Sequence, residues 1–334
     1  MNLLKIYFHE LSLEQEPYVR EALKEHELVF SAHSVGEAGV SQDTDVLCIF
    51  VHCKITPEVL NKLPNLKLIC TMSTGFDHID IKACQQRNVT VCNVPAYGSH
   101  SVAEHAFALL LSLSRRIPQS LIHLRKKTFI REELKGLDLS EKTLGILGAG
   151  SIGQFVARIG KGFGMNVIAH DVFPNQRVAQ QIGFRFVDLP TLLSSSDVIS
   201  VHLPYNKYTH HLLNKENIQT VKKGSVFINT ARGGIIDTYA LLFALKNGIF
   251  SAAGLDVLEE EDLFLKPGRV TGATAEQKQV LKMNKEIIKQ PHVLYTPHNA
   301  FNTVEAEQRI TAKTVQNIQA FLAGNPASVV HPVE

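Results

Sequence analysis

A glycine-rich segment at residues 148–153, with the sequence GAGSIG, constrains the fold of this chain more than any other feature. It follows an apolar run at 142–147 that has the pattern of a buried parallel strand, and it opens a helix-like stretch. A second strand pattern at 166–170 ends at Asp171. This order of strand, glycine loop, helix and acidic strand end is typical of a dinucleotide-binding βαβ unit, whereas the glycine pattern alone also occurs in other turns.

The residues of this unit have separable predicted roles. Gly148 allows the tight turn, Gly150 lets the backbone approach a pyrophosphate, and Gly153 lets the helix pack closely on the strand. The N-terminus of the helix then faces the phosphate charge. A carboxylate at Asp171 accepts both ribose hydroxyls of NAD and repels the 2′-phosphate of NADP, so the sequence predicts NAD as the cofactor.

Length and composition limit the remaining possibilities. A chain of 334 residues is long enough for two domains, and 45% hydrophobic with 20% charged residues is typical of a globular protein. The net charge of +2 gives no reason to expect a nucleic acid or an anionic membrane as partner. The longest apolar run, at 106–113, is interrupted by Ser112 and is too short to cross a bilayer.

Two features predict a cytoplasmic location. The N-terminal segment lacks the basic, apolar and small-residue regions of a signal peptide. The five cysteines are odd in number and lack metal-ligand spacing, so we interpret them as reduced thiols and expect no metal site.

Alternating strand and helix patterns predict a parallel sheet in residues 1–100, a part without a glycine-rich phosphate loop. Its strand patterns lie at 5–8, 45–51, 66–71 and 89–94, and its helical patterns at 14–27, 56–63 and 80–87. A long apolar helix is predicted at 101–116, before a polar stretch to 141. Later patterns are strands at 197–203, 226–230, 252–257 and 292–296, a basic helix-like stretch at 266–289 and an amphipathic helix at 305–322.

Three later segments place chemically useful side chains where strands end, and ligands of open parallel sheets bind beyond those carboxyl ends. Arg232, next to two glycines, is placed to grip a carboxylate through two hydrogen bonds, although arginines more often lie on the surface. The three glutamates at 259–261 follow another strand, but composition also allows a solvated loop there. His298 ends the last strand, where an imidazole can exchange protons near neutral pH, although a histidine is more often structural.

Together these segments resemble the D-isomer-specific 2-hydroxyacid dehydrogenase family, and within it the D-lactate dehydrogenase branch. The resemblance covers nearly the whole chain. It rests on STGFDHID at 73–80, NVPAY at 93–97, VAEH at 102–105, GAGSIG at 148–153, VHLP at 201–204, NTARGG at 229–234, GLDVLEEE at 254–261 and TPHNA at 296–300. Motifs in this number and order are highly specific.

The resemblance implies hydride transfer between NAD(H) and a 2-keto or 2-hydroxy acid. It implies that Arg232 binds the substrate carboxylate and that His298 protonates the keto oxygen. The acid that pairs with this histidine in the family lies five positions after the aspartate of GLDV, which selects Glu261. The implied substrate-binding residues are Thr74, Gly75, Tyr97 and Phe301, and the implied cofactor-binding residues are Gly148, Gly150, Ser151, Ile152, Gly153, Asp171, Leu203, Pro204, Thr209, Thr230, Ala231 and Asp256.

The resemblance also implies an α/β architecture of two Rossmann-like domains with parallel sheets. A flavodoxin-like substrate-binding domain at 1–100 and 299–334 would carry an inserted NAD-binding Rossmann domain at 101–298, and the family habit favours a homodimer.

The expected substrate is pyruvate, because the long gap between Glu261 and His298 is similar to that of the D-lactate branch. Phe301 stands where that branch often has tyrosine, which leaves open a broader D-2-hydroxyacid dehydrogenase for bulkier acids. A non-catalytic NAD-sensing protein of the same fold is the alternative from another class.

Overall fold

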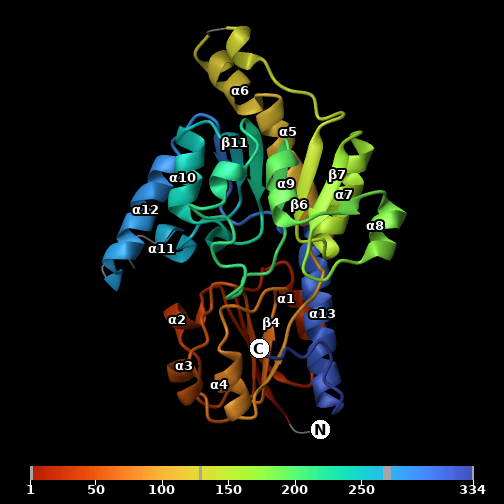
Figure 1. Ribbon diagram of the computed structural model, residues 1–334. Coiled ribbons are helices and arrows are strands. Elements are labelled where there is room, and N and C mark those ends of the chain that lie inside the picture. Colours follow the sequence, from red (N-terminus) through yellow and green to blue (C-terminus); the bar gives the residue numbers. More distant parts are fainter. Residues whose placement is uncertain (1–2, 128–129, 266–271, 333–334) are drawn as a thin grey trace. The chain divides into compact units, whose positions relative to one another are not determined.

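The computed structural model describes residues 3–127, 130–265 and 272–332, which fold into two compact units (Figure 1). The first unit comprises Met1–Tyr97 and Asn302–Glu334, and the second comprises Gly98–Phe301. The boundaries predicted from the resemblance fall after residues 100 and 298. The units instead divide after Tyr97, where the helix predicted from residue 101 already begins at Ser99, and after Phe301, which belongs to the second unit.

The first unit contains a five-stranded parallel sheet in the order β2-β1-β3-β4-β5. Its strands are β1 (Lys5–His9), β2 (Glu27–Ser31), β3 (Val46–Ile49), β4 (Leu68–Thr71) and β5 (Thr90–Cys92), and its helices are α1 (Glu16–Ala22), α2 (Val35–Ala38), α3 (Pro57–Asn61), α4 (Ile81–Gln86) and α13 (Val304–Leu322). The helix predicted at 14–27 is longer than the observed one, because α1 ends at Ala22 and β2 begins at Glu27. β2 is an edge strand, and its apolar residues Leu28–Phe30 are only partly buried.

The second unit contains a seven-stranded parallel sheet in the order β12-β11-β10-β9-β6-β7-β8. Its strands are β6 (Thr143–Leu147), β7 (Asn166–His170), β8 (Arg185–Phe186), β9 (Val198–Val201), β10 (Ser225–Asn229), β11 (Phe250–Leu255) and β12 (Val293–Tyr295). Its helices are α5 (Ser99–Ser114), α6 (Ile117–Arg125), α7 (Ser151–Gly162), α8 (Gln176–Ile182), α9 (Leu189–Ser195), α10 (Thr238–Lys246), α11 (Glu261–Leu265) and α12 (Ala275–Ile287), with short 3-10 turns at Glu132–Leu134, Ile218–Thr220 and Gly233–Ile235.

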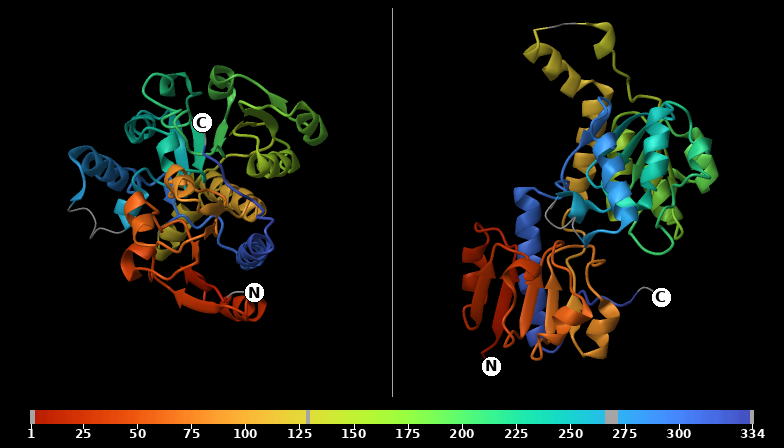
Figure 2. Two further views of the ribbon diagram at one scale, coloured as in Figure 1. Left: turned by 90° about the horizontal axis from the view of Figure 1, so that it is seen from below. Right: turned by 90° about the vertical axis from the view of Figure 1, so that its left-hand side faces the viewer.

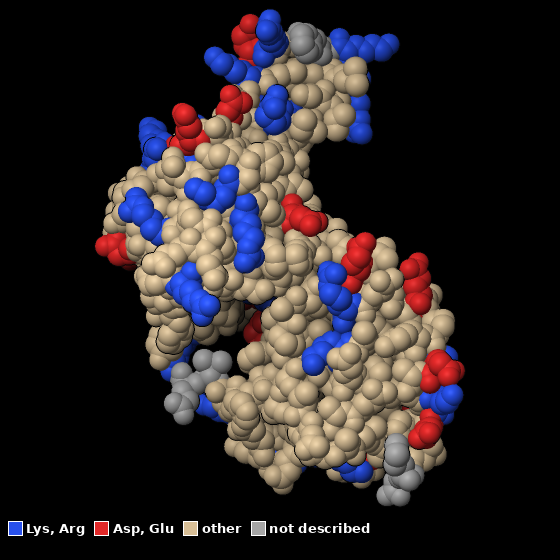
Figure 3. All heavy atoms as spheres, turned by 90° about the vertical axis from the view of Figure 1, so that its right-hand side faces the viewer, with Lys and Arg blue, Asp and Glu red and all other residues tan. Residues whose placement is uncertain are grey.

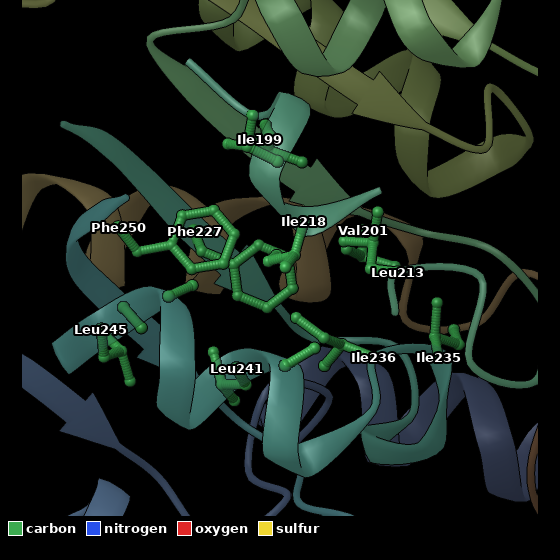
Figure 4. Packing of buried hydrophobic residues seen from close by; sticks show 14 of the residues in the cluster. Ile199, Val201, Leu213, Ile218, Phe227, Ile235, Ile236, Leu241, Leu245 and Phe250 are labelled. Carbon is green, nitrogen blue, oxygen red and sulfur yellow. The ribbon is translucent and has the colours of Figure 1, made fainter. Parts of the chain in front are cut away.

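Helices cover both faces of this second sheet. Side chains of α9, α10 and α12 pack on one face, and those of α5, α7 and α8 pack on the other. On the first face Phe227 of β10 stacks on Phe250 of β11 with ring centroids 4.9 Å apart (Figure 4). These two apolar layers hold the strands so that their carboxyl ends form one edge, where the predicted catalytic and cofactor-binding residues lie.

Two further segments of the second unit contain helices, of which only the second was predicted. The polar stretch after residue 116 includes α6, which extends from the end of α5 away from the rest of its unit (Figures 1 and 2). Of the basic stretch at 266–289, residues 266–271 lie outside the described residues and most of the remainder forms α12.

The cysteines, the surface charges and the apolar helices among the residues that the structure describes show no further feature that would define the fold. All five cysteines are buried free thiols. Basic and acidic side chains are interspersed on the face shown in Figure 3. Of the helices in the described part of the chain, none combines the length and apolar character needed to cross a membrane.

Candidate active site

The glycine loop between β6 and α7 is shaped by the close packing of the chain itself. Gly148 has a positive φ of 93°, and a Cβ there would lie 2.7 Å from the carbonyl oxygen of His202. A Cβ on Gly153 would lie 2.1 Å from the carbonyl oxygen of Gly148. By contrast, a Cβ on Gly150 would meet nothing within 4 Å. The N-terminus of α7, which includes Ser151 and Ile152, therefore opens onto free space that suits a phosphate group.

Asp171 is held beside this loop by two backbone hydrogen bonds. Its Oδ2 accepts a 2.8 Å hydrogen bond from the N–H of Ala149, and its Oδ1 accepts a 2.9 Å hydrogen bond from the N–H of Phe173. Each carboxylate oxygen retains a further acceptor site. The position and the remaining acceptors suit the two hydroxyls of a ribose.

The other predicted cofactor residues follow neighbouring strands of the same sheet. Leu203, Pro204 and Thr209 lie in the loop after β9, which the Thr209 hydroxyl stabilises by donating to the Pro204 carbonyl at 2.6 Å. Thr230 and Ala231 follow β10, and the buried hydroxyl of Thr230 has no hydrogen-bond partner among the described residues. An unpartnered hydroxyl at the carboxyl edge fits a site that a polar ligand completes.

His298 and Glu261 meet at the carboxyl edge, as the family pattern implies. Nδ1 of His298 lies 3.3 Å from Oε2 of Glu261, the first residue of α11. The two side chains are 23% and 16% exposed, so the pair is largely shielded but reachable. The contact uses Nδ1 and leaves Nε2 as the imidazole nitrogen that can face a substrate.

A buried aspartate fixes the turn that carries His298. The carboxylate of Asp256 accepts hydrogen bonds from the Thr296 hydroxyl at 2.5 Å and from the N–H groups of Asn299 and Ala300 at 2.9 Å each. The N–H of His298 donates to the Asp256 carbonyl at 2.8 Å, and His298 has a positive φ of 51°. Asp256 is fully buried, so the structure gives it an anchoring role that the motif did not reveal.

Two further polar side chains, those of His105 and Tyr295, lie close to Asp256. Nε2 of His105, on α5, lies 3.0 Å from the Thr296 hydroxyl and 3.5 Å from Asp256. Burial and the nearby charges of Glu261 and Asp256 raise the pKa of the Tyr295 hydroxyl, which stays neutral.

Arg232 lies in the loop between β10 and α10. Its Nη1 donates to the Ala231 carbonyl at 2.8 Å. The adjacent Gly233 packs against the chain before Glu261, because a Cβ on it would lie 2.0 Å from the carbonyl carbon of Leu258. The loops that carry the arginine and the glutamate are therefore in direct contact within the second unit.

The predicted substrate residues divide between the units. Thr74 and Gly75 follow β4 in the first unit, where the Thr74 hydroxyl donates to the Val94 carbonyl at 2.9 Å. The Tyr97 carbonyl accepts a 2.7 Å hydrogen bond from Nε of Arg309. Phe301 is in the second unit, with its Cβ 3.6 Å from the position of a Cβ on Gly98. The roles of these residues in substrate binding remain predictions.

Comparison with known proteins identifies the family. Residues 107–300 match the sequence model of the D-isomer specific 2-hydroxyacid dehydrogenase, NAD binding domain. The chain belongs to this family. The predicted family, the α/β fold with an NAD-binding Rossmann domain and the cofactor NAD are thereby confirmed. Among the described residues, no group of three or more histidines, cysteines and acids is placed to hold a metal ion.

Several relatives resemble this dehydrogenase over most of its length. It is 36% identical over 321 residues to a 2-hydroxyacid dehydrogenase homolog of Zymomonas mobilis, covering 95% of this chain and 94% of that protein. It is 37% identical to D-lactate dehydrogenase of Escherichia coli, covering 84% of both chains. It is 35% identical to glyoxylate reductase of Thermococcus litoralis, covering 87% of this chain and 84% of that protein.

Solved structures show the same similarity. The crystal structure of D-lactate dehydrogenase from Aquifex aeolicus, complexed with NAD and lactic acid, superposes with a TM-score of 0.87 at 36% identity, covering 98% of this chain and all of that one. A D-2-hydroxyisocaproate dehydrogenase superposes with a TM-score of 0.81 at 28% identity, covering 98% of this chain and 99% of that one. This dehydrogenase is therefore an oxidoreductase of a family whose members differ in their substrates.

Proposed function

We propose that this dehydrogenase reduces pyruvate to D-lactate with NADH as the electron donor, and catalyses the reverse oxidation. The observation that carries the chemistry is the pairing of His298 with Glu261 at the carboxyl edge, beside the loop of Arg232. Pyruvate is favoured over other 2-keto acids by the similarity to two D-lactate dehydrogenases at 36% and 37% identity.

The side chains have complementary roles in this reaction. NADH, when bound along the glycine loop and Asp171, supplies the hydride that reduces the keto carbon. Arg232 binds the substrate carboxylate through two parallel hydrogen bonds and so orients the carbonyl. His298 donates a proton from Nε2 to the keto oxygen, where negative charge develops in the transition state.

Glu261 supports this proton transfer from the far side of the imidazole. Its carboxylate, 3.3 Å from Nδ1 of His298, fixes the orientation of the ring so that Nε2 faces the keto oxygen. In the reverse direction the neutral imidazole accepts the hydroxyl proton, and Glu261 again fixes the orientation of the ring.

A broader D-2-hydroxyacid dehydrogenase is the second candidate. The similarity to a D-2-hydroxyisocaproate dehydrogenase favours it, as does the apolar ring of Phe301. An added methylene in an apolar pocket changes the transition-state energy by only about 1–3 kcal/mol, so related 2-keto acids are expected to compete.

The proposal is tested by the loss of NADH absorbance with pyruvate, with phenylpyruvate and 2-ketoisocaproate measured alongside. We expect the highest kcat/KM with pyruvate and D-lactate as the product. A preference for the bulkier acids would favour the broader enzyme, and NADH binding without any turnover would favour a sensing protein. His298→Gln should lower kcat by about 10²–10⁴-fold, whereas an unchanged kcat would contradict the assigned acid–base role.

A further inference from the structure

The carboxylate of Glu259 joins three segments of the second unit. Its Oε1 lies 2.7 Å from Nε2 of His211, in the loop after β9. Its Oε2 accepts hydrogen bonds from the hydroxyl of Thr238 at 2.5 Å and from the N–H of that residue at 3.3 Å, at the start of α10. Glu259 itself lies two residues before the catalytic Glu261. The loops after β9, β10 and β11 therefore meet at this one carboxylate.

The backbone at Glu259 is fixed as closely as its side chain. Its carbonyl accepts a 2.8 Å hydrogen bond from Nδ2 of the buried Asn284 in α12. A Cβ on Gly233 would lie 2.1 Å from the backbone nitrogen of Glu259, so the arginine loop rests on this peptide. Because Arg232 immediately precedes that glycine, movement at Glu259 would change the spacing between Arg232 and Glu261.

His211 extends the connection toward the loop predicted to line the cofactor. Its N–H donates to the Gly234 carbonyl at 2.8 Å, and its ring stacks on His210 with centroids 3.8 Å apart. Nδ1 of His210 lies 2.9 Å from the hydroxyl of Tyr205. The ring of Tyr205 comes within 2.9 Å of where a Cβ on Gly234 would be. The cofactor loop is thus linked to the arginine loop.

Neither solvation nor helix capping accounts for this arrangement. The side chain of Glu259 is only 17% exposed, unlike that of a solvated loop glutamate. The helix α10 already has an N-cap, because Asp237 accepts a 2.8 Å hydrogen bond from the N–H of Tyr239. The N–H of Thr238 is one of the first-turn amides that need an acceptor, but the contacts of Glu259 with the Thr238 hydroxyl and with His211 go beyond capping.

We infer that Glu259 is a positioning residue of the active site, which holds Arg232 and Glu261 at the spacing that the reaction requires. This inference rests on the proposed function. Glu259 touches His211 and Thr238, both outside the catalytic trio, so it acts through other residues. Loss of its contacts should lower kcat more than it weakens binding, since a displacement of about 1 Å can cost about 100-fold in rate.

Steady-state kinetics and NADH binding test the inference with Glu259→Ala and Glu259→Gln. For Glu259→Ala we expect kcat about 100-fold lower, with KM for the keto acid and Kd for NADH changed by less than about 3-fold. Glu259→Gln keeps one acceptor oxygen and should recover about 10-fold of the lost rate. A rise in Kd or KM that accounts for the whole loss would overturn the positioning role.

Hydrogen–deuterium exchange gives a readout that needs no turnover. In Glu259→Ala, amides in 230–238 and 256–265 should exchange faster, while those of β6 stay unchanged. Unchanged exchange in both segments would overturn the inference. If the wild-type protein turned over no 2-keto acid, the proposed function would fail, and the exchange data would still decide whether Glu259 positions these loops.

Three further variants serve as controls. His211→Ala should add little to the loss in Glu259→Ala, because both remove the same contact, and full additivity would contradict the inference. Glu260→Gln removes a neighbouring carboxylate that bonds Gln277 of α12 at 3.1 Å instead. His123→Gln breaks the pair that His123, a residue of α6, forms with Glu133. The last two should change kcat by less than about 3-fold, because neither residue takes part in the contacts of Glu259 with His211 and Thr238.

Discussion

His202 is a single residue whose protonation is coupled to folding. It follows β9, where Nε2 contacts the hydroxyl of Ser200 at 2.8 Å, and its Nδ1 is buried without a partner among the described residues. Burial lowers the pKa of His202 to about 3 from the usual 6.5. Its carbonyl also closes over Gly148 in the glycine loop. A neutral imidazole is therefore built into the support of the cofactor site.

This low pKa predicts an acid sensitivity of stability. Between pH 6.5 and about 3 the unfolded chain binds a proton at His202 that the folded chain does not, so stability falls as the pH falls through this range. His202→Gln removes this titrating group. Between pH 6.5 and about 3, the slope of the unfolding free energy against pH should therefore be smaller in the variant than in the wild type, by about 1 kcal/mol per pH unit. Urea unfolding at several pH values measures the effect. Parallel curves for variant and wild type would show that His202 titrates normally.

At the scale of elements, the sequence predicts those strands and helices that continuous, buried apolar runs mark. The strand predicted at 166–170 coincides with β7, because its interior positions are buried. β2 and α6 were missed because one is a half-buried edge strand and the other exposes much of its apolar surface. The role of Glu261 came from the family pattern alone. Spacing does not show that Glu259, two positions earlier, turns toward His211.

The two glycines at either end of the first turn of α7 allow a matched test of the cofactor site. Gly150→Ala should keep the wild-type Tm, because its Cβ has space and its φ of −69° suits alanine, but it should weaken NADH binding at least about 10-fold. Gly153→Ala should both weaken NADH binding and lower Tm, since its Cβ would lie 2.1 Å from the Gly148 carbonyl oxygen. Calorimetry and NADH titration separate the effects. Equal NADH affinity in Gly150→Ala and wild type would place the pyrophosphate elsewhere.

At the scale of the whole molecule, the exposed apolar side chains of α6 indicate a surface that binds another protein chain. The helix begins after Arg116, which has a positive φ of 54°, and extends from its unit (Figure 2). Four of its apolar side chains, Ile117, Leu121, Ile122 and Leu124, are 47–74% exposed. A cluster of exposed apolar side chains on one short helix marks an interaction surface, and a two-fold pairing of identical chains is the commonest way to cover one.

We therefore predict a homodimer that pairs through α6. Sedimentation velocity should show a dimer for the wild type and a monomer for the double variant Leu121→Glu/Leu124→Glu, because paired carboxylates cannot be buried in an apolar contact. Leu13→Glu is the matched control, since Leu13 is 76% exposed in the first unit. A monomeric wild type, or a dimer that survives both substitutions, would exclude this interface. Because the glycine loop at 148–153 and Asp171 both lie in one unit of one chain, the monomeric variant should still bind NADH.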